Sequence, residues 1–281
     1  MDLEHSAPKV AALGAAALAA LVALVCDWQL RQSFDSITYN VLAFLAVALL
    51  LDRDRNALRL QTSWSAILCA AFLLASGLAK ALTLVRGDDY RHFLPLILGM
   101  GVGFIALGFA QVFRHWRALV ILMALSFFDI PFSALTGPLN LNAHGATLGA
   151  NILLVCGYPA SSAGDVVTLP GGSVRVFGPC SAAVPLLYLL KLALLVLLLF
   201  PSAWWRKVLI LLSAIIVALL GNAIRIAVME IFAAAGDQGR FHYWHDGPGA
   251  NLFSVLYVAC FAGLAALSLH QWASKQILPS A

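Results

Sequence analysis

The sequence predicts an all-α polytopic membrane protein with about eight transmembrane helices. Of its 281 residues, 62% are hydrophobic and only 11% are charged, whereas a soluble domain carries about 25% charged residues. The chain also contains a series of apolar segments, most of them close to the ~20 residues that cross a bilayer as a helix. We therefore expect a single integral membrane domain over residues 1–281, embedded in the lipid bilayer.

The predicted spans are joined by short, charged connections, with one exception. Five spans lie within residues 1–136, and residues 137–269 hold a long loop followed by three more. We interpret the first span as retained rather than as a cleaved signal peptide, because acidic residues accompany the only lysine before it. The predicted spans are 10–26, 37–51, 65–84, 93–113, 118–136, 181–199, 208–233 and 251–269.

The loop at 137–180 is long enough to hold structure of its own. Residues 141–155 are apolar and predict a re-entrant or interfacial helix. Two β-prone stretches, 165–169 and 173–177, flank a Pro-Gly-Gly turn and predict a small hairpin, because glycine accepts the positive φ of a tight turn. The hairpin ends just before Cys180, so we expect it to form one wall above that thiol.

Lysine and arginine gather on the side of the membrane that holds both termini. These residues stay preferentially on the cytoplasmic side, so we expect the loop at 137–180 to face outward. The basic residues assigned to the inner side are Lys9, Arg53, Arg55, Arg59, Arg114, Arg117, Arg206, Lys207 and Lys275, and those assigned to the outer side are Arg31, Arg86, Arg91, Arg175 and Arg240.

This topology brings three polar groups to the outer face. Cys180 opens the sixth predicted span, His245 precedes the eighth, and Arg225 lies roughly 26 Å into the seventh at 1.5 Å per residue. A cysteine at a helix N-terminus beside a cation has a lowered pKa, as a nucleophile needs. Imidazole titrates near neutrality, which suits an acid or base. Asn222 shares a helix face with Arg225, and Arg225 is a candidate donor to an oxyanion. The group predicts thiol-based acyl chemistry.

Each member of this group also has an ordinary interpretation. Cys180 is consistent with an apolar filler or with a disulfide partner of Cys156. Arg225 is consistent with a side chain that snorkels to the outer interface. His242 and His144 compete with His245 for the role of the base.

Other charged residues suggest structural roles. Asp129 and Lys191 are both expected near mid-membrane, and we interpret them as a structural ion pair rather than as a proton path. Glu230 lies beyond the seventh span's polar pair and is expected to be solvated. The five cysteines lack metal-ligand spacing, so we expect no bound metal and no cofactor, and no basic stripe predicts a nucleic-acid partner.

Three motifs follow one another in the C-terminal half. They are Leu-Pro-Gly-Gly-Ser-Val-Arg-Val-Phe-Gly-Pro-Cys-Ser, ending at Ser181, Gly-Asn-Ala-Ile-Arg-Ile at 221–226, and His245 with Gly249 four residues on. Their order and spacing, together with the predicted topology, resemble the exosortase/archaeosortase family. One departure is Ala182, which stands where the family usually has glycine; we expect it to affect substrate choice rather than the nucleophile.

The resemblance implies a membrane-embedded cysteine endopeptidase or transpeptidase at the periplasmic side of a bacterial inner membrane. Its substrates would be C-terminal sorting tails, each with a short motif, a transmembrane helix and a basic end, as in the PEP-CTERM class. A thioester would pass to an amine acceptor or to water. The alternative is a non-enzymatic membrane transporter or an assembly partner of an envelope or exopolysaccharide system. The residues carried over are the catalytic Cys180, Arg225 and His245, with Asn222, Ser181 and Gly249 in support.

Overall fold

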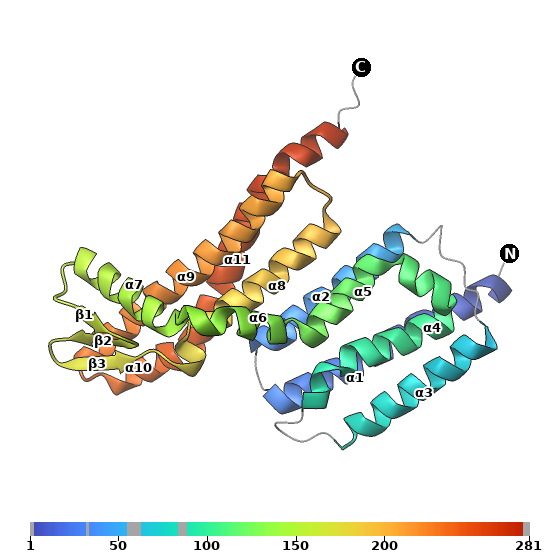
Figure 1. Cartoon of the computed structure of the whole chain (residues 1–281), viewed down its shortest axis with the longest axis horizontal. Helices are drawn as coiled ribbons and strands as arrows, with labels where there is room; N and C mark the ends of the chain where they lie inside the picture. Colours follow the sequence, from blue (N-terminus) through green and yellow to red (C-terminus); the bar gives the residue numbers. More distant parts are fainter. Residues whose placement is uncertain (1–2, 32–33, 55–62, 84–88, 278–281) are drawn as a thin grey trace. The chain divides into compact units, whose positions relative to one another are not determined.

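Helices dominate the computed structural model, which describes residues 3–31, 34–54, 63–83 and 89–277. The chain forms two compact units, 1–130 and 131–281 (Figure 1). The elements in chain order are α1 (Leu3–Arg31), α2 (Phe34–Arg53), α3 (Trp64–Ala81), η1 (Asp89–His92), α4 (Leu94–Arg114), α5 (Trp116–Phe127), α6 (Asp129–Thr136), η2 (Gly137–Leu139), α7 (Leu141–Val155), β1 (Ser161–Ala163), β2 (Val166–Leu169), β3 (Gly172–Arg175), η3 (Gly178–Cys180), α8 (Ala183–Leu199), α9 (Trp204–Ala234), α10 (Gln238–His245) and α11 (Pro248–Ile277).

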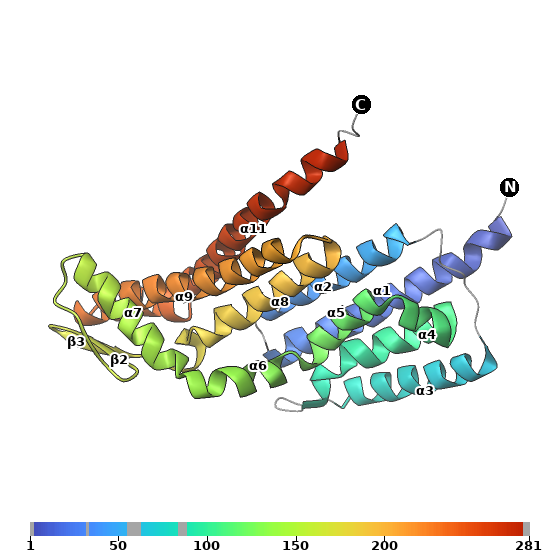
Figure 2. The same ribbon diagram turned by 45° about the horizontal axis from the view of Figure 1, so that its top comes forward.

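The first unit is a bundle of apolar helices. Helix α3 packs along α4, α1 also packs on α4, and α2 packs on α5 (Figure 2). The close approach of α3 and α4 depends on glycine, since a Cβ at Gly101 would lie 2.7 Å from the Leu74 side chain. Ser63 starts α3 by accepting a hydrogen bond from the Ala66 N–H at 3.2 Å, which satisfies one of the amides that a helix leaves open at its beginning.

The helices are long and apolar enough for a membrane protein. Within the described ranges, α2, α3, α4, α9 and α11 have spanning length and composition, and the pair α5–α6 makes a sixth if it counts as one broken span. The predicted spans 10–26 and 181–199 correspond to α1 and α8, which are apolar but fall short by the same measure. The all-α polytopic class is confirmed, whereas the count of eight spans and the division at residue 136 stay predictions.

In the second unit, α9 is the central helix. Helices α8 and α11 pack on it, and α7 crosses it at the end that also carries the small sheet and α10 (Figures 1 and 2). A Cβ at Gly149 of α7 would lie 2.9 Å from the Ile226 side chain, and one at Gly221 of α9 would collide with the Tyr257 ring of α11. Glycines on α7 and α9 therefore allow the close approach of all three helices.

The predicted hairpin is confirmed and is larger than expected. Strands β2 and β3 pair antiparallel with Leu169 opposite Gly172, and β1 adds a third strand on the other side of β2. Gly171 in the β2–β3 turn has φ +109°, and a Cβ there would lie 2.5 Å from the carbonyl oxygen of Ala234. The turn therefore rests directly on the last residues of α9.

Two local features differ from the sequence prediction. The fifth predicted span, 118–136, is interrupted at Phe128, so that α5 and α6 are separate helices. Residues 238–245 form α10, a polar helix begun by Asp237, whose carboxylate accepts a hydrogen bond from the Arg240 N–H at 2.9 Å.

Candidate functional site

Cys180 is the last residue of a 3₁₀ turn, not the first residue of a helix as predicted. Helix α8 begins at Ala183, and between them the Ser181 hydroxyl accepts a hydrogen bond from the Ala183 N–H at 3.2 Å. Ser181 thus provides a hydrogen-bond acceptor for one of the amide groups that lack a partner at the start of α8. Ser181 and Ala182 therefore separate Cys180 from the first residue of α8, whereas the sequence analysis expected the cysteine at the start of that helix.

Asn222 holds the turn that carries Cys180. Its side-chain Nδ2 donates a hydrogen bond of 3.0 Å to the Cys180 carbonyl oxygen, and Asn222 has no exposed surface. Because a buried polar contact lacks competition from water, this bond holds the peptide group between Cys180 and Ser181 in place. Asn222 therefore positions Cys180, a role that the shared helix face with Arg225 did not specify.

Arg225 holds the segment that carries His245. Its Nη2 donates to the His245 carbonyl oxygen at 2.6 Å and its Nε to the Trp244 carbonyl oxygen at 3.3 Å. These carbonyls belong to the last turn of α10, where a helix leaves its carbonyl groups without partners. Only 8% of Arg225 is exposed, so the snorkelling interpretation does not describe this side chain. One turn of α9 thus joins the cysteine and histidine segments.

The His245 ring lies against Phe241, with the ring centres 5.2 Å apart and the planes nearly parallel at 16°. Its Nδ1 is buried without a hydrogen-bond partner and lies 3.8 Å from the Asp246 carboxylate. The competing His242 is more open, with 64% of its side chain exposed against 30% for His245. The third candidate, His144, is an exposed residue of α7. Of the three histidines, His245 is the most enclosed by protein.

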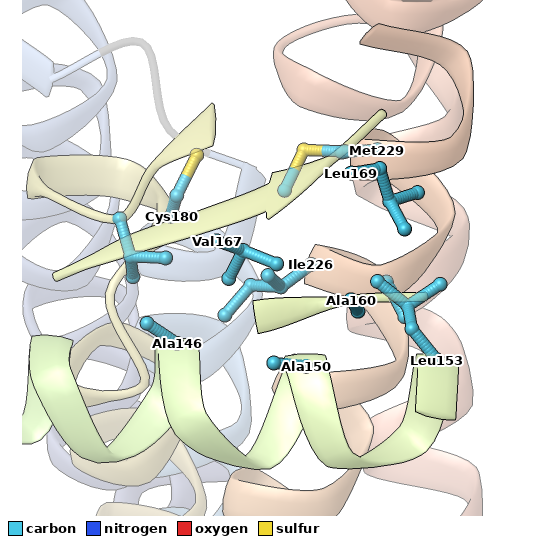
Figure 3. Close-up of a cluster of buried hydrophobic side chains, with 11 residues drawn as sticks. Ala146, Ala150, Leu153, Ala160, Val167, Leu169, Cys180, Ile226 and Met229 are labelled. Carbon is cyan, nitrogen blue, oxygen red and sulfur yellow. The ribbon is translucent and has the colours of Figure 1, made fainter. Parts of the chain in front are cut away.

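The Cys180 side chain belongs to an apolar cluster. It is 2% exposed and packs with residues of α7, the sheet and α9, among them Val167 and Ile226 (Figure 3). Burial raises the pKa of the Cys180 thiol; the Arg225 guanidinium acts in the opposite direction and lowers it, and the Asp246 carboxylate raises it further. The net direction is upward, contrary to the lowered pKa expected from the sequence, because desolvation of a thiolate outweighs one nearby cation.

The other predicted support residues have local packing roles. A Cβ at Gly249 would lie 2.6 Å from the Trp244 ring and 2.7 Å from that of Tyr243, so glycine allows the aromatic residues of α10 to pack against the start of α11. Ala182 is 1% exposed and has ordinary right-handed helical angles. Its backbone does not need glycine, and its methyl group is covered by protein. Cys156 and Cys180 are free thiols, which removes the disulfide interpretation.

Glu230 is a structural residue that the sequence analysis misjudged. It was expected to be solvated, but it has no exposed surface, and its Oε1 accepts a hydrogen bond of 3.0 Å from the Leu169 N–H. This carboxylate ties β2 to α9. Glu230 lies eight residues after Asn222, on the same face of the α-helix. This spacing could have predicted from the sequence that Glu230 is buried.

The predicted ion pair stays a prediction. Asp129 begins α6 in the first unit, and Lys191 is a 5% exposed residue of α8 in the second, near the ring of Tyr188 at 6.0 Å.

The geometry defines a polytopic membrane protein in which buried side chains of one helix, α9, tie a cysteine turn to a histidine-bearing helix end. Residues 28–262 match the family model for transmembrane exosortase (Exosortase EpsH), so the chain belongs to the transmembrane exosortase family. Comparison with curated proteins and with solved structures gives no match. The resemblance inferred from the three motifs is thereby confirmed at the level of the family.

Proposed function

We propose that this exosortase is a cysteine endopeptidase or transpeptidase that cleaves C-terminal sorting tails at the extracytoplasmic face of a bacterial inner membrane. The observation that carries the proposal is the pair of ties from α9, where Asn222 bonds to the Cys180 carbonyl and Arg225 bonds to the His245 carbonyl. Asn222 and Arg225, three positions apart on α9, thus hold the segments that carry the proposed nucleophile, Cys180, and the proposed base, His245.

The reaction begins with a neutral thiol. Because burial raises its pKa, Cys180 transfers its proton to His245 as Sγ attacks the scissile carbonyl carbon. The tetrahedral intermediate collapses with cleavage of the C–N bond, and His245 returns the proton to the departing amine. The thioester on Cys180 is then attacked by an amine acceptor or by water, which releases the thiol.

Arg225 has two roles in this proposal. Its hydrogen bonds to two α10 carbonyls orient the His245 segment, and its positive charge lowers the pKa of Cys180. The same charge favours the oxyanion of the tetrahedral intermediate. The charge that stabilises the thiolate therefore also stabilises the transition state.

The length of α9 supports the proposal of an active site at the boundary of the membrane. Helix α9 has 31 residues, or about 46 Å at 1.5 Å per residue, whereas the hydrocarbon core is about 30 Å thick. Asn222, Arg225 and Glu230 lie in the last part of this helix. If the transmembrane helix of a substrate lies beside the bundle, the sorting motif next to that helix would lie level with these residues.

The rival proposal is a non-enzymatic transporter or assembly partner of an envelope system. It is favoured by the burial of Cys180 in an apolar cluster, where cysteine acts as a small hydrophobic residue. The two proposals differ over Cys180→Ala. The rival expects this variant to keep its function, because alanine also fills an apolar site.

The experiment is co-expression with a reporter that ends in a sorting motif, a transmembrane helix and a basic tail. We expect Cys180→Ala to leave the reporter at full length, while Cys156→Ala, a change at an exposed free thiol of the same unit, processes it as the unmodified protein does. Normal processing by Cys180→Ala overturns the proposal. Accumulation of both variants at the level of the unmodified protein excludes misfolding as the cause.

A further inference from the structure

A basic depression of about 210 Å³ lies in the first unit, far along the chain from Cys180. It is formed where α2 ends, α4 ends and α5 begins. Three arginines line it together with one carboxylate, one histidine and one tryptophan: Arg53, Arg114, Arg117, Asp54, His115 and Trp116. Nothing in the proposed peptide chemistry uses these residues.

The charge balance of the depression favours an anion. Among the described residues that line it, Asp54 is the one carboxylate, and its Oδ2 lies 3.2 Å from His115 Nδ1, a ring nitrogen that donates to it. The three guanidinium groups leave the lining with a positive charge. The N-cap residue of α5, His115, makes no capping hydrogen bond with its side chain, so the first amides of that helix add partial positive charge at the same place.

The surroundings of the depression fit a lipid rather than a soluble ion. Trp116 is 55% exposed, and tryptophan is enriched where the membrane meets water. Leu49, which is 53% exposed, lies one turn before Arg53 on the same face of α2. An acyl chain along this apolar face would place its phosphate beside the arginines, as in other basic pockets between membrane helices.

We propose that this depression binds the phosphate group of an anionic phospholipid headgroup. Arg114 and Arg117, from the end of α4 and the start of α5, donate to the phosphate oxygens, and Arg53 completes the positive surface. The guanidinium fork matches phosphate geometry, so arginine suits this contact well. The residues of this depression are none of those proposed for the peptide chemistry, and the proposal does not depend on that chemistry.

The test is native mass spectrometry of the full-length protein in a neutral detergent, titrated with phosphatidylglycerol, phosphatidylcholine or inorganic phosphate. We expect one phosphatidylglycerol to bind more tightly than phosphatidylcholine. In Arg114→Gln/Arg117→Gln the affinity should fall about 30-fold, because two charges at the headgroup are lost. The variant Arg114→Lys/Arg117→Lys should keep most of it. The matched control is Arg175→Gln, which removes a 67% exposed arginine of β3 and should change nothing.

Two results would overturn the proposal. One is phosphatidylglycerol binding by Arg114→Gln/Arg117→Gln that equals binding by the Arg175→Gln control. The other is displacement of the lipid by inorganic phosphate at equal concentration, which would assign the depression to a soluble anion. Equal melting temperatures of the glutamine and lysine variants establish that lost affinity is not lost folding.

Discussion

The bond from Asn222 to the Cys180 carbonyl makes a quantitative prediction about the thiol. In Asn222→Ala the buried carbonyl loses its 3.0 Å donor, and an unsatisfied buried acceptor costs about 1–3 kcal/mol. The loss is partly offset because the Asn222 Oδ1 is itself buried without a partner, and the substitution removes it. We therefore expect the low end of the range, about 1–1.4 kcal/mol, which makes opening of the turn about 5–10 times more frequent.

The assay is alkylation of Cys180 by a maleimide in detergent, in a background where alanine replaces the other cysteines, Cys26, Cys69, Cys156 and Cys260. The rate should rise about 5–10-fold in Asn222→Ala at every pH. The control is Ser213→Ala on the same helix: Ser213 is also buried, but its hydroxyl donates only to the Ile210 carbonyl of α9 itself at 2.8 Å. Equal rates for the two variants would refute the positioning role of Asn222.

Two further predictions concern charge and backbone conformation. Asp246→Asn removes a carboxylate that raises the pKa of Cys180, so the pH profile of Cys180 alkylation should shift to lower pH. The control Asp237→Asn, at the other end of α10, should not shift it. An unchanged profile in both variants would contradict the effect of the Asp246 carboxylate on the pKa of Cys180. Gly171→Ala combines a φ of +109° with a clash against the α9 backbone, so it should cost on the order of 3 kcal/mol of unfolding free energy. Gly164→Ala, at φ +58° with open space around it, should cost only about 1–2 kcal/mol; similar melting temperatures for the two glycine variants would disprove the docking of the turn.

Long apolar runs made most of the helices predictable, because burial in lipid imposes both composition and length. The segment 141–155 and the hairpin around Gly171 were also predicted, the second from two β-prone stretches that flank a Pro-Gly-Gly turn. Helix α10 was not, since 238–245 is polar and its formation depends on packing against α9 and α11. Strand β1 was missed for a related reason: Ser-Ser-Ala has no alternating pattern, and only pairing with β2 makes it a strand.

The candidate site was predicted as a set of residues but not as a set of contacts. The spacing of Asn222 and Arg225 showed that they share a helix face. A spacing within one helix does not predict which groups on other segments these side chains contact. The pKa direction of Cys180 was wrong because the sequence indicated a nearby cation and a helix start but not the apolar cluster around the sulfur. Burial is set by tertiary packing, and it dominates here.

Three polar residues in the last part of α9 have a structural role in common, apart from the proposed chemistry. Asn222 donates to a carbonyl of the 3₁₀ turn, Arg225 donates to carbonyls at the end of α10, and Glu230 accepts from an amide of β2. Each bond satisfies a backbone group of a segment that is not a membrane-spanning helix. Near a bilayer such groups lack water, and irregular backbone persists only where protein supplies partners. Loss of activity on changing Arg225 is therefore expected from folding as well as from catalysis, and the Cys180 variant is the one that separates them.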